Sequence, residues 1–187
     1  MTWLIVVTRI EAPAEVCFDL ARSVDAHTET SAFTKERVVP PGRTSGLLEC
    51  GDLVTFQGVH FGLRQRFTAK IAEMERPRYF VDELVRSAFR SLRHIHDFRE
   101  EGGATVMTDA LEWVSPFGFL GRLADVIAVR RHMRRFLVRK QGILKQMAER
   151  SEMLRHGTTA MAASVRGSHV DTAPGPQTRN AADSEPE

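Results

Sequence analysis

The stretch FLGRLADVIAVRRHMRRFLVRKQGILKQMAE, residues 119–149, decides the fold class of this chain. Large apolar residues recur in it every three to four positions, as in a helix with one buried face. They are Phe119, Leu123, Val126, Met133, Phe136, Leu137, Leu144 and Met147. At 1.5 Å per residue the stretch would form a helix roughly 46 Å long, enough to cross a whole sheet. We therefore predict one long C-terminal helix that packs its apolar stripe on a sheet.

Strand-like runs precede this helix, and short turn signals such as Gly102-Gly103 separate them. They lie at residues 3–10, 36–39, 53–61, 63–72, 79–86, 89–99 and 104–113. Two short helices are predicted after the first run, one beginning near Pro13 and one with Ser23 as its N-cap. Because short links join antiparallel neighbours, we predict an α+β domain with a curved antiparallel sheet of about seven strands wrapped around the long helix.

Length and composition favour a single domain. The chain has 187 residues, of which 42% are apolar and 27% charged, as in ordinary globular proteins. The composition changes after residue 150, where Ala, Ser, Thr, Gly and Pro dominate and no apolar period continues. We therefore predict a folded domain over residues 1–150 and a disordered C-terminal tail over residues 151–187.

Charge and cysteine content exclude several classes of protein. The net charge of +2 gives little whole-molecule attraction to nucleic acid, so no nucleic-acid partner is predicted. Two cysteines, Cys17 and Cys50, are too few for a disulfide framework and lie in no zinc-binding pattern. No apolar run is long enough to span a membrane, and residues 1–13 lack the features of a signal peptide. We expect a cytoplasmic protein.

Several segments, taken in order, resemble the SRPBCC superfamily, which includes the START, Bet v 1 and polyketide cyclase groups with the helix-grip fold. They are EAPAEVCFDL at 11–20, RPRYFVDE at 76–83, HIHDF at 94–98, TVMTD at 105–109 and SPFG at 115–118. The resemblance covers about residues 1–150. It implies a deep, mostly apolar cavity between sheet and helix that holds a lipid, polyketide, sterol-like or aromatic molecule. The superfamily has no universal catalytic residue, so the resemblance alone does not settle function.

Polar residues on two adjacent strands are the first candidates for a site. Residues two apart share a strand face, which groups His94 and His96 with Leu92 and Phe98. The next strand groups Asp109 with Met107 and Trp113. If both faces border the cavity, these polar groups would contact a ligand or act as an acid–base pair. The alternative is a self-satisfied cross-strand pair that closes the core.

The predicted ligand-binding set combines these polar groups with large apolar neighbours: His94, His96, Asp109, Trp113, Phe98, Met107, Phe56 and Met133. The same apolar residues could instead form a closed core, because the pattern does not separate a filled core from a lined cavity. Which of Asp82 and Glu83 points inward stays open, since apolar residues accompany both. His60 lies between Gly58 and Gly62, which favours a structural role at a bend.

The sequence favours a binding protein over an enzyme but leaves both open. The His-x-His spacing offers only two close ligands, so no metal and no other cofactor is predicted. Signature motifs of serine hydrolases and nucleotide-binding proteins are absent from the sequence. The main prediction is binding of a hydrophobic or aromatic small molecule, and the alternative is a polyketide-type cyclase or dehydratase. The helix at 119–149 is rich in arginine, which gives contact with a membrane surface as a third alternative.

Overall fold

The computed structural model describes residues 1–86, 88–116, 118–119, 121 and 125–167, without the side chains of residues 126 and 156–167. The chain divides into two compact units, Met1–Met153 and Leu154–Glu187. The sheet, the core and the candidate site all lie in the first unit. Among the described residues, no helix combines the length and the apolar character needed to cross a membrane.

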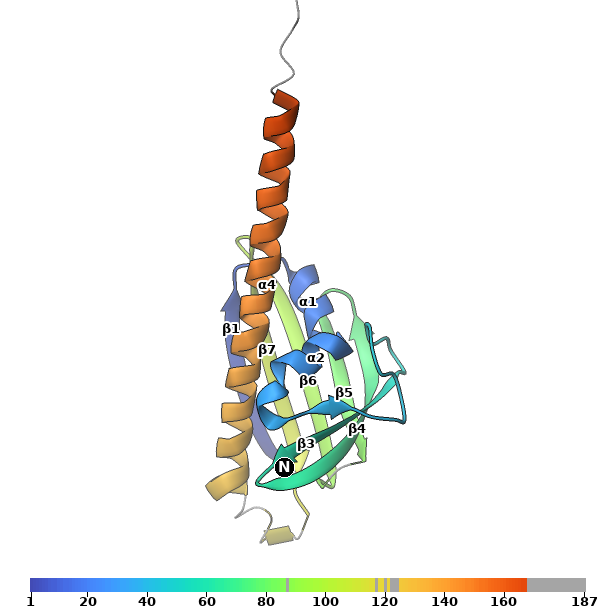
Figure 1. The fold of residues 1–187 in the computed structure, drawn as a ribbon. Coiled ribbons are helices and arrows are strands. Elements are labelled where there is room, and N and C mark those ends of the chain that lie inside the picture. Colours follow the sequence, from blue (N-terminus) through green and yellow to red (C-terminus); the bar gives the residue numbers. More distant parts are fainter. Residues whose placement is uncertain (87, 117, 120, 122–124, 168–187) are drawn as a thin grey trace, which may run out of the picture. The chain divides into compact units, whose positions relative to one another are not determined.

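Seven antiparallel strands form one sheet in the order β1-β7-β6-β5-β4-β3-β2 (Figure 1). The strands are β1 (Thr2–Ile10), β2 (Arg37–Val38), β3 (Leu53–His60), β4 (Leu63–Glu75), β5 (Tyr79–Arg86), β6 (Ser91–Glu101) and β7 (Ala104–Val114). Strands β3 to β7 form a meander, and β1 closes the order by pairing with β7. The predicted α+β helix-grip fold is therefore confirmed.

Two short helices follow β1, as the turn and capping residues predict. Helix α1 (Ala14–Ala21) begins after Pro13, and α2 (Val24–Thr30) begins after Ser23. The Ser23 hydroxyl caps α2 by accepting a hydrogen bond from the backbone N–H of Ala26 at 3.2 Å. A short 3-10 turn, Ala32–Thr34, leads into β2. Helix α1 contacts β6 and β7, where its buried Cys17 and Phe18 join the core.

The last helix begins and ends later than the sequence predicts. Helix α4 spans Arg130–Gly167, and a π-helical turn, Asp125–Val129, precedes it. In this turn Asp125 accepts hydrogen bonds from Trp113 of β7 and Thr2 of β1, which ties the start of the helix to the sheet. Of the predicted apolar stripe, Phe119 is exposed and Leu123 lies outside the described residues.

The C-terminal end of α4 bears on the predicted tail. The helix continues past residue 150 to Gly167. Residues 151–167 include three alanines, which favour helix, and no proline, which would break it. The first compact unit ends at Met153, close to the predicted domain boundary. Residues 168–187 lie outside the described residues, so a disordered tail there stays a prediction.

Inner-face residues of the sheet, α1 and α4 form the core. One cluster joins Phe18, Phe80 and Phe98 with Leu144 of α4, and a second joins Leu111 and Trp113 with Leu137 of α4. Gln141 of α4 receives a hydrogen bond from Thr8 of β1 at 2.6 Å. These contacts hold α4 against the inner face of the sheet, where Figure 1 shows it beside α1 and α2.

Two glycines predict opposite effects of the same substitution. A Cβ added to Gly58 in β3 would lie 2.5 Å from Cγ of buried Glu36, whereas one added to Gly142 in α4 meets no atom within 4 Å. We expect Gly58→Ala to lower the free energy of unfolding by about 1–3 kcal/mol, because a packed side chain must move. Gly142→Ala should raise it by about 0.5–1 kcal/mol, because alanine forms helix more readily. Urea denaturation measures both, and effects of the same sign would contradict the structure.

Candidate functional site

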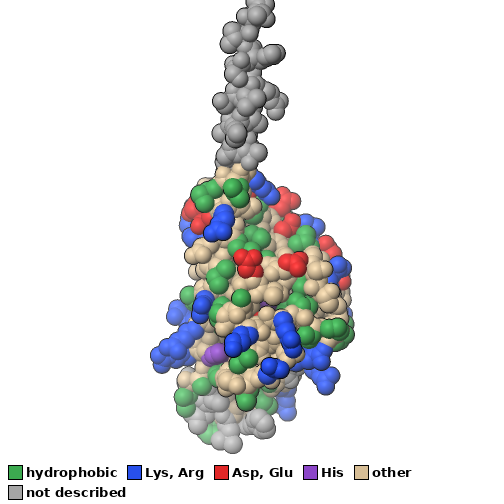
Figure 2. Space-filling model, viewed as in Figure 1, with side chains coloured by type: hydrophobic (Ala, Val, Ile, Leu, Met, Phe, Trp, Pro, Cys, Tyr) green, Lys and Arg blue, Asp and Glu red, His purple; other side chains and the backbone are tan. Residues whose placement is uncertain are grey.

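A cavity of about 150 Å³ lies between the inner face of the sheet and α4. Its apolar walls include Val54, Phe56, Ile71, Leu111, Met133 and Leu137. Phe61, at the turn between β3 and β4, also lines the cavity and is 49% exposed, so the cavity reaches the surface there. Figure 2 shows lysine and arginine side chains over the lower half of this face of the molecule, in the same view as Figure 1.

The structure separates the predicted ligand-binding residues into two groups. His94, His96, Phe56 and Met133 line the cavity. The other four are buried, but they are not among the described residues that line it: Asp109, Trp113, Phe98 and Met107. The alternation in β6 and β7 correctly placed all six strand residues on the inner face, but only part of that face borders open space.

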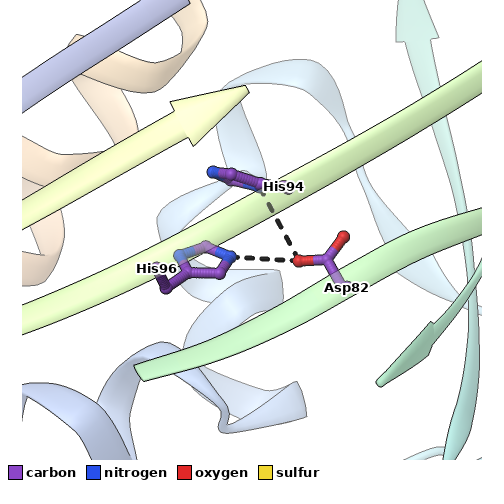
Figure 3. Close-up of side chains that lie close together, drawn as sticks. All are labelled: Asp82, His94 and His96. Atoms are coloured by element: carbon purple, nitrogen blue, oxygen red, sulfur yellow. Dashed lines mark hydrogen bonds and ion pairs between the residues drawn. The ribbon is translucent and has the colours of Figure 1, made fainter. Parts of the chain in front are cut away.

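Two histidines and two aspartates form a cluster at one wall of the cavity, which we call the His–Asp cluster: Asp82, His94, His96 and Asp109. All are buried except Asp82, which is partly exposed. Asp82 of β5 pairs in register with His94 of β6, and His96 pairs with Asp109 of β7. Both histidines therefore lie between the two carboxylates. Figure 3 shows their rings beside Asp82.

Each aspartate of the His–Asp cluster faces both histidines. Asp82 Oδ2 lies 3.0 Å from His96 Nε2 and 3.7 Å from His94 Nδ1. Asp109 Oδ1 lies 2.6 Å from His96 Nδ1 and 3.4 Å from His94 Nε2. The two contacts of Asp109 are close enough for ion pairing, but their orientation is not that of a hydrogen bond. His94 Nε2, His96 Nδ1 and Asp109 Oδ1 are thus buried without a hydrogen-bond partner among the described residues.

Burial and the neighbouring charges determine which of the two histidines is positively charged. Burial alone would lower the pKa of His96, but Asp109 and Asp82 outweigh burial and raise it to about 9. Burial and the positive charge of His96 lower the pKa of His94. Burial would raise the pKa of Asp109, yet the two histidines hold it well below its usual range. At neutral pH the cluster therefore holds a charged His96, a neutral His94 and two carboxylates.

A second set of polar side chains, which we call the Glu36 chain, also borders the cavity: Lys140, His27, Glu36, His60 and His132. Lys140 Nζ lies 2.9 Å from His27 Nδ1, and His27 Nε2 lies 3.0 Å from Glu36 Oε2. The other oxygen of Glu36 lies 3.1 Å from His60 Nε2, and His60 Nδ1 lies 3.1 Å from His132 Nε2. All except His132 line the cavity.

One assignment of protons satisfies every contact in the Glu36 chain. His27 and His60 each donate from Nε2 to Glu36, while their Nδ1 atoms accept from Lys140 and His132. Burial, together with the charge of Lys140, lowers the pKa of His27 to about 4, so this histidine is neutral at pH 7. Burial would raise the pKa of Glu36, but its two histidine partners hold it far below the usual range. The chain is thus a directional network around one carboxylate.

Reasoning from the sequence missed Asp82 and most of the Glu36 chain. Asp82 has the period of Phe80 and Leu84, which also line the cavity, but Glu83 has an equally apolar set of neighbours. A signal for Lys140 was present, because it lies four residues after Phe136 and four before Leu144 in the apolar stripe. His60 was assigned a structural role, and the structure adds that it lines the cavity.

The Glu36 chain predicts a loss of stability in mild acid. Because the pKa of His27 is lowered to about 4, the unfolded chain takes up a proton below pH 6.5 that the folded protein resists. Stability from this group is therefore present above pH 6.5 and is lost as the pH falls toward 4. His27→Gln keeps one donor and one acceptor but does not titrate. Between pH 7 and pH 5 we expect the parent to lose about 2 kcal/mol more than this variant in urea denaturation.

The rest of the chain is shared by parent and variant, so acid loss from other carboxylates cancels in this difference. At pH 7 the His27→Gln variant should unfold within about 1 kcal/mol of the parent. Parallel stability profiles from pH 7 to pH 5 would show that His27 is not held neutral by the fold.

No family model and no curated protein matches the sequence, but solved structures match the fold. TTHA0849 from Thermus thermophilus is similar with a TM-score of 0.66 at 16% identity, covering 80% of this chain and 99% of that one. Zhui aromatase/cyclase from Streptomyces sp. R1128 has a TM-score of 0.64 at 12% identity, covering 80% and 94%. Major latex-like protein 151 from Panax ginseng has a TM-score of 0.59 at 12% identity, covering 79% and 97%. At such low identity the likeness shows the helix-grip fold alone and not the function.

Proposed function

We propose that this protein, which has the helix-grip fold of the SRPBCC superfamily, binds a small aromatic or otherwise apolar molecule that carries one polar group. The observation that carries the proposal is the cavity, whose apolar walls meet buried polar side chains at two places, the His–Asp cluster and the Glu36 chain. Apolar pockets with a few placed polar groups are the usual form of small-molecule sites. The fold likeness to an aromatase/cyclase and to a major latex-like protein agrees with this proposal.

The size of the cavity limits the ligand. An apolar cavity of about 150 Å³ in another protein accommodates benzene, so a ligand of one or two rings fits this one without rearrangement. We expect the polar group of the ligand to contact His94, His96 and Asp82. Asp109, which the sequence predicted as a ligand contact, does not line the cavity. We also propose a cytoplasmic location, which the two free thiols, Cys17 and Cys50, support.

Titration with 2-naphthol, followed by its own fluorescence, tests the binding proposal. Ala69 of β4 is buried and lines the cavity, so Ala69→Leu should fill part of the space and weaken binding at least about tenfold. Ala72→Leu on the same strand is the matched control, since Ala72 does not line the cavity, and should bind as the parent does. No binding to the parent at about 1 mM probe would overturn the proposal, as would equal binding by both variants.

A second candidate function is a polyketide-type cyclase or dehydratase. The specific observation in its favour is His94, a neutral imidazole that lines the cavity with its Nε2 at 3.4 Å from Asp109 Oδ1. Such a group can remove a proton while the carboxylate orients it. Incubation with a linear poly-β-ketone and chromatography of the products tests this activity. A cyclase should lose about 10²- to 10⁴-fold in rate in His94→Gln, whereas a binding protein converts no substrate.

A further inference from the structure

We propose that Asp82, His94 and His96 form a binding site for a divalent transition-metal ion that opens into the cavity. Their ligand atoms all lie within 4.8 Å of one another. Asp82 Oδ2 is 3.0 Å from His96 Nε2 and 3.7 Å from His94 Nδ1. Neighbouring ligands of one ion with bonds of about 2.1 Å are about 3.0–3.5 Å apart, so these atoms need only small movements to share an ion. The inference does not depend on the cavity holding an organic molecule.

The strands hold these three side chains in place. Asp82 and His94 face each other in the pairing of β5 with β6, and His96 follows His94 by two residues on the same face. Figure 3 shows the interactions of both rings meeting at one oxygen of the Asp82 carboxylate. Sites built on strands are more exactly positioned than sites on loops, because the sheet hydrogen bonds restrain the backbone.

Asp109 has the position of a carboxylate that orients metal-binding histidines. Its Oδ1 faces the nitrogens on the far side of each ring from Asp82, at 2.6 Å from His96 Nδ1 and 3.4 Å from His94 Nε2. With the ion bound, a proton on each of these nitrogens leaves His94 Nδ1 and His96 Nε2 as the ligand atoms, and His96 releases the second proton that it carries without the ion. Gln141 in turn donates to Asp109 Oδ2 at 2.8 Å, which fixes the carboxylate.

Unpartnered atoms on the Asp109 side are a second, independent observation. His94 Nε2, His96 Nδ1 and Asp109 Oδ1 are buried and lack a hydrogen-bond partner among the described residues. A slight rotation of each ring toward Asp109 would give these nitrogens a hydrogen bond and would leave the opposite nitrogens to an ion. A bound ion would hold the rings in this rotated position, in which the buried nitrogens and Asp109 Oδ1 have hydrogen-bond partners.

Charge and ligand type identify the class of ion. Asp82 and Asp109 bring two carboxylates to the site, and once His96 has released its second proton a divalent ion balances both. Two imidazoles and one carboxylate suit Zn²⁺, Co²⁺ or Fe²⁺, whereas Ca²⁺ and Mg²⁺ prefer oxygen ligands alone. All three ligands line the cavity, so an ion bound to them would border it.

Titration of the tag-free, EDTA-treated full chain with Co²⁺ tests the proposal through the visible absorption of the bound ion. We expect one Co²⁺ per chain, displaced by one equivalent of Zn²⁺. Asp82→Asn and His96→Gln should each weaken binding at least about 100-fold, and Asp109→Asn about 10- to 100-fold, as expected for a group that only orients the ligands. His132→Gln, in the Glu36 chain, is the matched control and should bind as the parent does.

Near-UV circular dichroism of each metal-free variant checks that it folds, and His94→Gln replaces any variant that does not. Absence of a Co²⁺ spectrum in the parent at about 1 mM ion would overturn the proposal. So would binding that survives Asp82→Asn and His96→Gln, or that is lost in His132→Gln. The metal-free parent also serves for the 2-naphthol titration, so the two proposals fail separately.

Discussion

Replacing Asp109 by alanine is expected to lower the free energy of unfolding by about 3–5 kcal/mol at pH 7, because it removes the nearer of the two carboxylates that balance the buried charge of His96. Asp109 is 2% exposed, and its Oδ1 lies 2.6 Å from Nδ1 of the charged His96. Its Oδ2 accepts a hydrogen bond from Gln141 of α4 at 2.8 Å, so the substitution leaves that amide with only the longer hydrogen bond to the Val6 carbonyl, at 3.4 Å. Urea denaturation at pH 7 measures the effect.

A control and a double variant separate lost charge from lost packing. Asp97 of β6 pairs with exposed Arg99, so Asp97→Ala should cost less than about 1 kcal/mol. If uncompensated charge dominates, the double variant Asp109→Leu/His96→Leu should be more stable than Asp109→Leu alone. Equal costs for Asp109→Ala and Asp97→Ala would contradict the buried ion pair.

Trp113→Ala should be about as destabilising, by about 3–5 kcal/mol, because it removes the largest fully buried side chain and leaves a cavity. Trp113 is 0% exposed, packs near Phe89 and donates from Nε1 to Asp125 Oδ1 at 2.9 Å. Since Asp125 lies at the start of the last helix, the substitution also loosens the attachment of that helix to the sheet. Thermal and urea denaturation both measure the loss.

The other tryptophan of the chain is the control. Trp3 lies in β1 and is 46% exposed, so Trp3→Ala should cost less than about 1 kcal/mol. Trp113 does not line the cavity, so Trp113→Phe should keep the affinity for 2-naphthol. A small effect of Trp113→Ala on stability, or a loss of probe binding in Trp113→Phe, would contradict the placement of Trp113 in the closed core and indicate that it lines the cavity.

Local periodicity was sufficient to predict the sheet, its meander and the face on which the candidate residues lie. Alternation along β6 and β7 placed His94, His96 and Asp109 on the inner face, and each is buried there. Alternation works because a strand turns every second side chain to the same side, whatever the sheet packs against. The same reasoning failed for Asp82 and Glu83, because apolar neighbours accompany both phases of β5.

Only the tertiary structure decided which inner-face residues border open space and which are in contact with one another. Phe98 and Phe56 are both large apolar residues of predicted strands, yet Phe98 packs against Phe18 while Phe56 lines the cavity. The Glu36 chain brings Lys140 of α4 into contact with His27 of α2, which is 113 positions away, and continues through Glu36, next to β2, to His60 of β3. Sequence period reports the direction of a side chain from its own backbone. Whether that direction ends in a packed neighbour, a charged partner or a cavity depends on elements that the chain brings together from far apart.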